Sequence, residues 1–252
     1  EFVAWQWKAN GGTTSSNTDG NITSTVQANQ SAGFSIVFYT GNGTQTGKTV
    51  GHGLGAVPKM IISKDRDGTS NVATWRVYHQ DIGATKYLQM PQTDAAATYN
   101  DWDNTSPTSS VYSVGGAGGY TPTNTNNTEY IAFVFAEVQG FSKIGRYTGN
   151  NNADGPYVYC GFKPAWIMVK KTSATGDWRS WDHRRIENGL TQRIRLNATD
   201  NEDSGYDHLE ITSNGFKLRS TSSSINSSGD FIFLAFAENP FVTSTGTPTT
   251  AR

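Results

Sequence analysis

The stretch "GFSIVFYTGNG" (residues 33–43) decides the fold of this chain, because a close copy of it, "GFSKIGRYTGNN", returns at residues 140–151. Three more segments return in the same order: "PKMIISK" as "PAWIMVK", "TKYLQMPQTD" as "TQRIRLNATD", and "EYIAFVFAEVQGF" as "DFIFLAFAENPF". The kept order and the nearly constant spacing indicate one unit that occurs twice. A unit of this length is domain-sized rather than one rung of a solenoid.

The segments inside each copy are typical of β-strands. They are short, rich in aromatic and β-branched residues, and bounded by Gly, Asn, Ser and Pro, which favour turns. "YIAFVFAEV" (residues 130–138) is apolar on both faces, as a central sandwich strand would be. Only "DAAATYNDW" (residues 94–102) could form a helical turn. The sequence therefore predicts an all-β protein of two tandem antiparallel β-sandwich repeats, jelly-roll-like, of about a hundred residues each.

The repeat also predicts where the parts of the chain begin and end. The opening "EFVAWQWKAN" is similar to the last strand of each copy, so we expect residues 1–12 to be the closing strand of a preceding module. Residues 13–32, rich in Ser, Thr, Asn and Gln, are expected to be a linker. The first β-sandwich repeat is expected at residues 33–139 and the second at residues 140–241. Residues 242–252 are expected to form an extended tail.

Composition argues against several classes of partner. The formal net charge is −1, whereas a nucleic-acid-binding protein normally carries a basic excess, so we expect no nucleic-acid partner. No apolar run approaches the ~20 residues of a membrane span, so we expect no membrane insertion. The single cysteine, Cys160, allows no intrachain disulfide. We expect it to be a small buried apolar residue.

The segment "GNGTQTGKT" (residues 41–49) is one residue away from a phosphate-binding loop. That motif needs four residues between its first Gly and the Gly-Lys-Ser/Thr triplet, and a helix after it. Here the spacing fails, "VGHGLG" follows in place of a helix, and the second copy has Pro156 where the first has Lys48. We therefore interpret the segment as a hairpin turn and expect no nucleotide and no other cofactor.

Residue types that carry catalysis or bind metals form no recognisable pattern. His52 and His79 lack metal-ligand spacing and are expected in turns or on the surface. Glu137 and Glu238 occupy equivalent positions in the two copies, which favours a structural role over the carboxylate pair of a glycoside hydrolase. "DRDGTSN" (residues 65–71) begins like a calcium loop but lacks its closing glutamate, so a polar hairpin is preferred and calcium binding stays an alternative. The sequence thus predicts no enzyme, no catalytic residue and no metal site.

The aromatic residues divide into two groups. Trp75 aligns with Trp178, and Tyr78 with Trp181, so these four are expected in the cores of the two copies. Other aromatics lie in polar, Asn-, Asp- and Gly-rich segments outside the strand pattern. Rings presented on loops suit the binding of sugar or protein, because an aromatic face adds contact area at a low entropy cost. The predicted ligand-binding residues are Tyr99, Trp102, Tyr120 and Tyr206.

With "GFSIVFYTGNG…VGHGLGAVPKMIISK", "GFSKIGRYTGNNNADGPYVYCGFKPAWIMVKK" and the ending "AFAENPFVTSTGTPTTAR", the chain resembles a family of phage proteins. It is similar to the tandem repeat module of unknown function in tail-fibre and other virion proteins of aquatic bacteriophages. In that family the module often follows a laminin-G or concanavalin-like domain. The resemblance covers essentially the whole chain, and the family supplies no catalytic residue to carry over.

The resemblance implies a virion structural protein, with a tail-fibre or receptor-binding segment that adheres to host-surface glycan as the first expectation. The expected partners are other virion proteins and a host cell-surface glycan or protein, and the expected place is the virion tail rather than the capsid. A homo-oligomer, a trimer by analogy with fibres, is also expected. The alternatives are a capsid decoration or head-fibre protein, a polysaccharide depolymerase, and a secreted adhesin or surface-filament protein.

Overall fold

The computed structural model describes residues 3–9, 12–68, 74–187, 190–202 and 209–238. The prediction of an all-β protein is confirmed: every ladder between named strands is antiparallel, and the described helical structure is one 3₁₀ turn, η1 (Gln30–Ala32). Within these residues no helix is long and apolar enough to cross a bilayer.

The chain divides into two compact units, which interleave along the sequence. Unit 1 comprises Glu1–Tyr87 and Thr98–Ala136, and unit 2 comprises Leu88–Ala97 and Glu137–Arg252. The short segment Leu88–Ala97, which separates the two stretches of unit 1, therefore belongs to unit 2.

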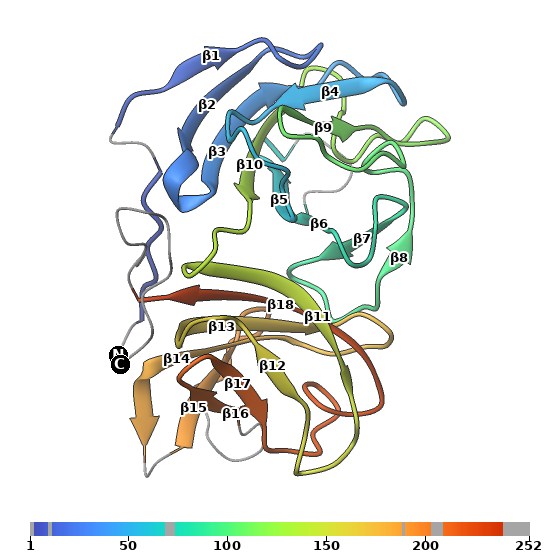
Figure 1. Ribbon diagram of the computed structural model, residues 1–252. Coiled ribbons are helices and arrows are strands. Elements are labelled where there is room, and N and C mark those ends of the chain that lie inside the picture. Colours follow the sequence, from blue (N-terminus) through green and yellow to red (C-terminus); the bar gives the residue numbers. More distant parts are fainter. Residues whose placement is uncertain (1–2, 10–11, 69–73, 188–189, 203–208, 239–252) are drawn as a thin grey trace. The chain divides into compact units, whose positions relative to one another are not determined.

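Unit 1 is built on most of one large antiparallel sheet, whose strands lie side by side in Figure 1 in the order β1-β2-β3-β10-β5-β6-β7-β8. The last two strands, β7 and β8, have residues in both units. A two-stranded sheet of β4 and β9 faces it. The bounds are β1 (Ser15–Asn17), β2 (Ser24–Asn29), β3 (Phe34–Thr40), β4 (Lys48–Gly51), β5 (Met60–Asp65), β6 (Arg76–His79), β7 (Lys86–Gln89), β8 (Ala97–Thr98), β9 (Val111–Val114) and β10 (Glu129–Phe135).

The core of unit 1 lies between its two sheets. Val37 and Tyr39 of β3 alternate with residues of the opposite face, and they pack with Val50 of β4 and Tyr112 of β9. The rings of Tyr39 and Tyr130 stack with their centroids 5.0 Å apart, and the buried hydroxyl of Tyr39 donates to the Thr123 carbonyl at 2.7 Å. The result is a sandwich in which the buried Tyr39 hydroxyl is tied to the loop around Thr123.

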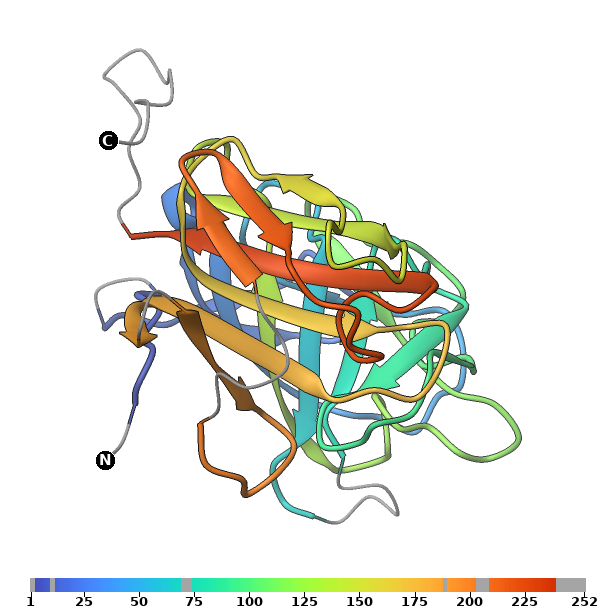
Figure 2. The same ribbon diagram turned by 90° about the horizontal axis from the view of Figure 1, so that it is seen from below.

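Unit 2 has the same two-layer construction. Its larger sheet has the order β11-β18-β13-β14-β15, and Figure 2 shows β18 (red), β13 and β14 (gold to orange) running alongside one another. Its smaller sheet has the order β12-β17-β16. The bounds are β11 (Ser142–Gly149), β12 (Tyr157–Tyr159), β13 (Pro164–Lys171), β14 (Trp178–Glu187), β15 (Leu190–Arg195), β16 (Leu209–Thr212), β17 (Gly215–Leu218) and β18 (Gly229–Ala237).

The core of unit 2 is aromatic. Phe216 of β17 packs edge-to-face on Tyr147 and Phe233, from the two neighbouring strands β11 and β18 of the facing sheet. Tyr147 stacks on Phe231 at 5.1 Å. Cys160 is 5% exposed in this core, and burial raises the pKa of its thiol to about 12, so the prediction of a buried apolar cysteine is confirmed.

A buried lysine fixes the segment Leu88–Ala97 within unit 2. The Lys170 side chain is fully buried, and its Nζ donates to four carbonyl oxygens, two of them from this segment: Thr93 (3.0 Å), Asp94 (2.8 Å), Lys171 (3.0 Å) and Gly176 (2.8 Å). Trp178 Nε1 donates to the Gln89 carbonyl at 2.9 Å. We call this arrangement the lysine clamp.

The structure differs from the predicted linker at residues 13–32. This region contains β1 and β2, and β2 pairs with β3 over six residues. The reason lies in the alternation of β2, which buries Ser24 and Val26 and exposes Thr25, so the polar residues occupy the solvent face of a real strand. Residues 3–9, part of the predicted closing strand, form no strand.

Two smaller predictions were wrong. Residues 41–49 do not form a hairpin turn, because β3 and β4 belong to different sheets and the loop crosses between them. His52 and His79 are not on the surface: both are fully buried, and a ring nitrogen of each accepts from a nearby backbone N–H, of Leu54 and Asp81 respectively. Burial lowers the pKa of His52. By contrast, Tyr78, Trp178 and Trp181 are buried as expected, whereas Trp75 is only half-buried.

Candidate functional site

Two of the predicted ligand-binding residues meet in unit 1. The rings of Tyr99 and Tyr120 lie edge-to-face with their centroids 5.6 Å apart. The Tyr99 hydroxyl donates to the Ala117 carbonyl at 2.6 Å, and Tyr120 Oη accepts from Arg76 Nη2 at 3.1 Å. Both rings are half-buried, and both hydroxyls already have hydrogen-bond partners within the protein.

The other two predicted residues are placed differently. Trp102 is 1% exposed and packs edge-to-face on Tyr78 at 5.8 Å in the core of unit 1. Its ring therefore has no face open to a ligand. Tyr206 lies outside the described residues.

A buried ion pair lies behind Tyr120. Arg76 is 4% exposed and Asp101 is fully buried, with Nη1 and Oδ2 3.4 Å apart. The Arg76 guanidinium also stacks over the Tyr87 ring at 4.2 Å. Burial raises the pKa of Asp101 to about 6, while Arg76 pulls it down. The pair is closed to solvent, so it holds the loop around Asp101 in place rather than offering a charge to a ligand.

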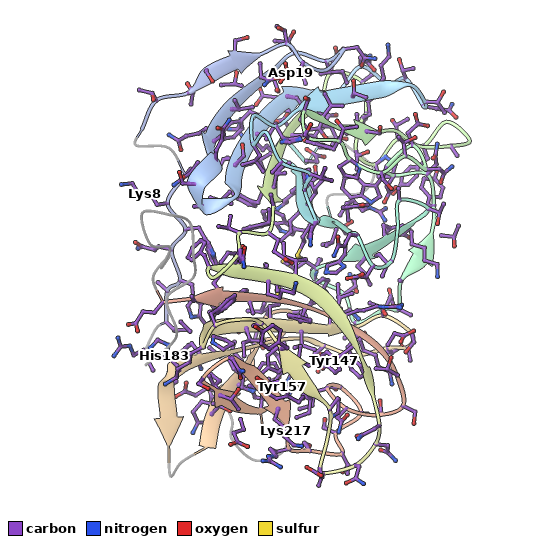
Figure 3. All side chains as sticks on the ribbon, in the orientation of Figure 1. Lys8, Asp19, Tyr147, Tyr157, His183 and Lys217 are labelled. Atoms are coloured by element: carbon purple, nitrogen blue, oxygen red, sulfur yellow. The ribbon has the colours of Figure 1, made fainter. Side chains whose placement is uncertain are left out.

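Among the described residues, the most exposed aromatic side chains lie on β12 of unit 2. Tyr157 is 44% exposed and Tyr159 is 63% exposed, whereas Val158 between them is buried. Residues two apart on a strand share a face, about 6–7 Å apart along the strand, so both rings are on the outer side of the smaller sheet. Figure 3 labels Tyr157 and Lys217 on this side of the unit.

The neighbouring residues keep the two rings close to the sheet. The Tyr157 hydroxyl donates to Asn214 Oδ1 and accepts from Thr212 Oγ1 at 3.3 Å. A Cβ at Gly215 would lie 2.9 Å from the Tyr157 hydroxyl, and one at Gly161 would lie 3.6 Å from that of Tyr159. Glycine at position 215 therefore leaves room for the Tyr157 phenol along the surface, whereas the contact at Gly161 is an ordinary van der Waals one.

Paired charges border the rings. Asp154 accepts from Lys217 at 2.7 Å and from Arg219 at 3.2 Å, and Arg219 also pairs with Glu210 at 2.7 Å. The hydrogen bond and the charge of Lys217 lower the pKa of Asp154. We define the tyrosine face as the side chains of Tyr157, Tyr159, Asp154, Glu210, Lys217 and Arg219. Its two carboxylates and two cations balance, so the face carries aromatic area and hydrogen-bonding groups without a net charge.

Sequence reasoning missed the tyrosine face because "YVY" is also what a core strand looks like. One signal was present: Pro156 precedes the strand, and proline is tolerated at a strand's first position and on edge strands. Among the described residues, no three His, Cys, Asp or Glu side chains gather as metal ligands.

Residues 1–240 match the model of a protein family described as a domain of unknown function, DUF7483, and the chain belongs to this family. No curated protein and no solved structure matches the chain.

Proposed function

We propose that the protein is a bacteriophage virion component, a tail-fibre or receptor-binding segment that adheres to glycan on the host surface. The observation that carries the adhesive part of the proposal is the pair of exposed rings, Tyr157 and Tyr159, on one face of β12. Sugar rings present C–H faces that pack on aromatic rings, and their hydroxyls suit a border of hydrogen-bonding groups. The virion part rests on the sequence resemblance.

The charges of the tyrosine face favour adhesion over polysaccharide cleavage. A glycosidase needs one carboxylic acid that holds a proton at working pH, with its pKa raised. Lys217 instead lowers the pKa of Asp154, and Glu210 is paired with Arg219. Neither carboxylate is suited to protonate a leaving group, which supports a binding role and no enzymatic activity.

We also propose that the two units are tandem copies, in support of the spacer-and-adhesin design. Both contain a fully buried asparagine, Asn124 or Asn226, that joins two loops. Asn124 Oδ1 accepts from Asn42 N at 3.0 Å and its Nδ2 donates to Asn42 Oδ1 at 2.9 Å. Asn226 does the same with Asn150, at 3.0 and 3.1 Å. Shared buried polar geometry of this kind favours duplication over coincidence.

A single tyrosine face gives a small contact, so avidity from several copies is part of the proposal. Linking weak sites raises overall binding by about two to four powers of ten when they can engage together. A homotrimer, assembled with other virion proteins in the tail, would supply those copies.

Gold-conjugated antibody against this chain, imaged on purified virions, tests the placement. The proposal expects gold at the tail. Gold over the head would instead indicate a capsid decoration or head fibre, and virions without gold would indicate a secreted adhesin. Release of sugar from host envelope by the purified protein would indicate a depolymerase.

A further inference from the structure

Residues 15–29 of unit 1, which we call the strap, extend its larger sheet beyond β3 and cover the edge of β4 in its smaller sheet. Strand β2 pairs along β3, from Ser24 opposite Tyr39 to Asn29 opposite Phe34. The strap also bonds to β4: Ile22 N donates to Thr49 O at 3.0 Å, Thr49 N donates to Asn21 Oδ1 at 2.9 Å, and Ser24 Oγ donates to Gly51 O at 2.8 Å. The outer edge of β4 is therefore fully used.

The described part of unit 2 contains no counterpart of the strap before β11. Only residues 136–141 lie between β10 and β11, and β11 is the first strand of its sheet, as β12 is of the smaller one. Phe141 N and Ser142 N both donate to the Val138 carbonyl, so this short connection is already folded into a turn. In the described part of unit 2, no strand pairs with the outer edge of β12.

The predicted repeat places the tyrosine face at the uncovered position. Gly47 aligns with Gly155, so Thr49 aligns with Tyr157 and Gly51 with Tyr159. The strap of unit 1 thus crosses the positions at which unit 2 exposes its two tyrosines. A Cβ at Gly51 would lie 1.6 Å from Oδ1 of the Asn17 side chain in the strap, so a larger residue there would displace that side chain. A tyrosine at this position therefore disfavours a strap docked in the same way.

The backbone of β12 adds hydrogen-bonding groups to the rings. Leu218 N of β17 donates to Pro156 O, and Cys160 N donates to Asn214 O. The peptide groups of the even-numbered residues from 156 to 160 therefore point toward β17. Since backbone direction alternates along a strand, the N–H and C=O of Tyr157 and Tyr159 point to the outer edge. Rings and free peptide groups together form a strip along the strand.

From this we propose that the outer edge of β12 binds the interior of an extended polysaccharide chain, with successive sugar rings against Tyr157 and Tyr159 and their hydroxyls on the strand's peptide groups. Unit 1, closed by its own strap, is then the spacer and unit 2 the binding unit. The strip runs along an exposed strand edge, which suits a chain lying across it, whereas a terminal sugar is better held in a closed pocket. The proposal deepens the proposed function and rests on it.

Titration of the full chain with purified surface polysaccharide of the host, and with sized fragments of it, tests this. We expect affinity to rise with fragment length until a fragment spans both rings. Tyr159→Gly, the residue that unit 1 has there, is expected to weaken binding about tenfold, and Tyr157→Ala likewise. Tyr159→Phe keeps the ring and is expected to bind within about twofold of the parent. Val57→Ala, an exposed apolar residue of unit 1, is the matched control.

The outcomes separate the two proposals. If no polysaccharide binds at all, the proposed adhesive function fails. If polysaccharide binds but Tyr157→Ala and Tyr159→Gly leave it unchanged, or a single sugar competes as well as a long fragment, the binding strip is overturned while adhesion stands. Self-association of the chain that Tyr159→Gly or Tyr157→Ala abolishes would identify the edge as a protein-docking strand and would also overturn the strip.

Discussion

At the scale of single residues, the buried carboxyl of Asp101 makes the stability of unit 1 depend on pH. Its pKa in the folded protein is about 6, above the ordinary value of 3.8. An acid whose pKa is raised by folding stabilises the folded state as long as it stays protonated. The contribution of Asp101 to stability is therefore fully present below about pH 4 and is lost as the pH rises through 6. Arg76, 3.4 Å away, offsets part of the cost of the charged form.

Asp101→Asn should therefore remove a pH dependence. Between pH 4 and pH 7, the parent protein is expected to lose about 3 kcal/mol of unfolding free energy relative to the variant, from a shift of about two pKa units. Chemical denaturation of both proteins at several pH values measures this difference. If the unfolding free energies of the two proteins changed with pH in parallel, Asp101 would be ionised in the folded protein at no net cost, and the prediction would be wrong.

The sequence predicted least well which individual side chains are buried and which are exposed. Trp102 has aspartates on both sides and was expected on a loop surface, yet it is buried because Asp101 itself is buried against Arg76. Tyr157 and Tyr159 were overlooked because strand alternation tells which residues share a face but not which face meets solvent. Cross-sheet packing decides that, and one sequence alone does not contain it.

At the scale of elements, the strap depends on a glycine. A Cβ at Gly20 would lie 2.5 Å from the Thr49 carbonyl oxygen and 2.9 Å from Gly51 N, both backbone atoms that cannot turn aside. The strap therefore approaches β4 more closely than any side chain allows.

Gly20→Ala is expected to lift the strap and cost about 2 kcal/mol of stability. Hydrogen exchange at the Ile22 amide, which bonds to Thr49 O, should accelerate with it. Gly118→Ala is the control, because a Cβ there meets nothing within 4 Å and only its positive φ of 61° is strained. An unchanged Ile22 exchange rate would count against the strap as described.

The lysine clamp is the second element with a testable role. Lys170→Met would remove the shared donor of four carbonyl oxygens, of which Thr93 O keeps the Gly176 amide, at an expected cost of about 3 kcal/mol. The Ala96 amide, which donates to Thr172 O at 2.9 Å, should then exchange faster. Burial lowers the pKa of Lys170 to about 8, from 10.5. Below pH 8 the buried amine is charged, and the desolvation of this charge lowers the free energy of unfolding by its full amount. As the pH rises from 8 to 10.5 the amine loses its proton in the folded protein first, so the free energy of unfolding increases over that window.

Lys163→Met, at an exposed position, is the control for the clamp. Equal stability of Lys170→Met and Lys163→Met would show that the four contacts do not hold the segment Leu88–Ala97.

At the scale of the whole molecule, the strand-rich repeat pattern correctly predicted the all-β class, because the strand periodicity and the turn residues agree over the whole chain. The pattern did not predict that Leu88–Ala97 joins unit 2. Lys170 follows four apolar residues in "WIMVKK" and precedes Lys171, and nothing in that run signals that its amine is the donor for a distant segment.

Cutting the chain between the units tests this interleaving. A fragment of residues 137–252 lacks Thr93, Asp94 and Gln89, so the clamp loses two of its four acceptors and Trp178 Nε1 loses the Gln89 carbonyl. We expect the fragment to unfold at lower denaturant concentration than unit 2 of the full chain. A synthetic peptide of residues 85–100 should restore part of the loss, whereas a fragment as stable as the full chain would contradict the interleaved arrangement.

The central claim is that this chain adheres to host glycan through the tyrosine face of unit 2. Competition of the purified full chain with phage for adsorption to host cells tests it most directly, with the double variant Tyr157→Ala/Tyr159→Ala beside the parent. The account predicts that the parent slows adsorption and that the double variant, folded and equally stable, does not. Equal inhibition by both proteins, or none by the parent, would contradict it.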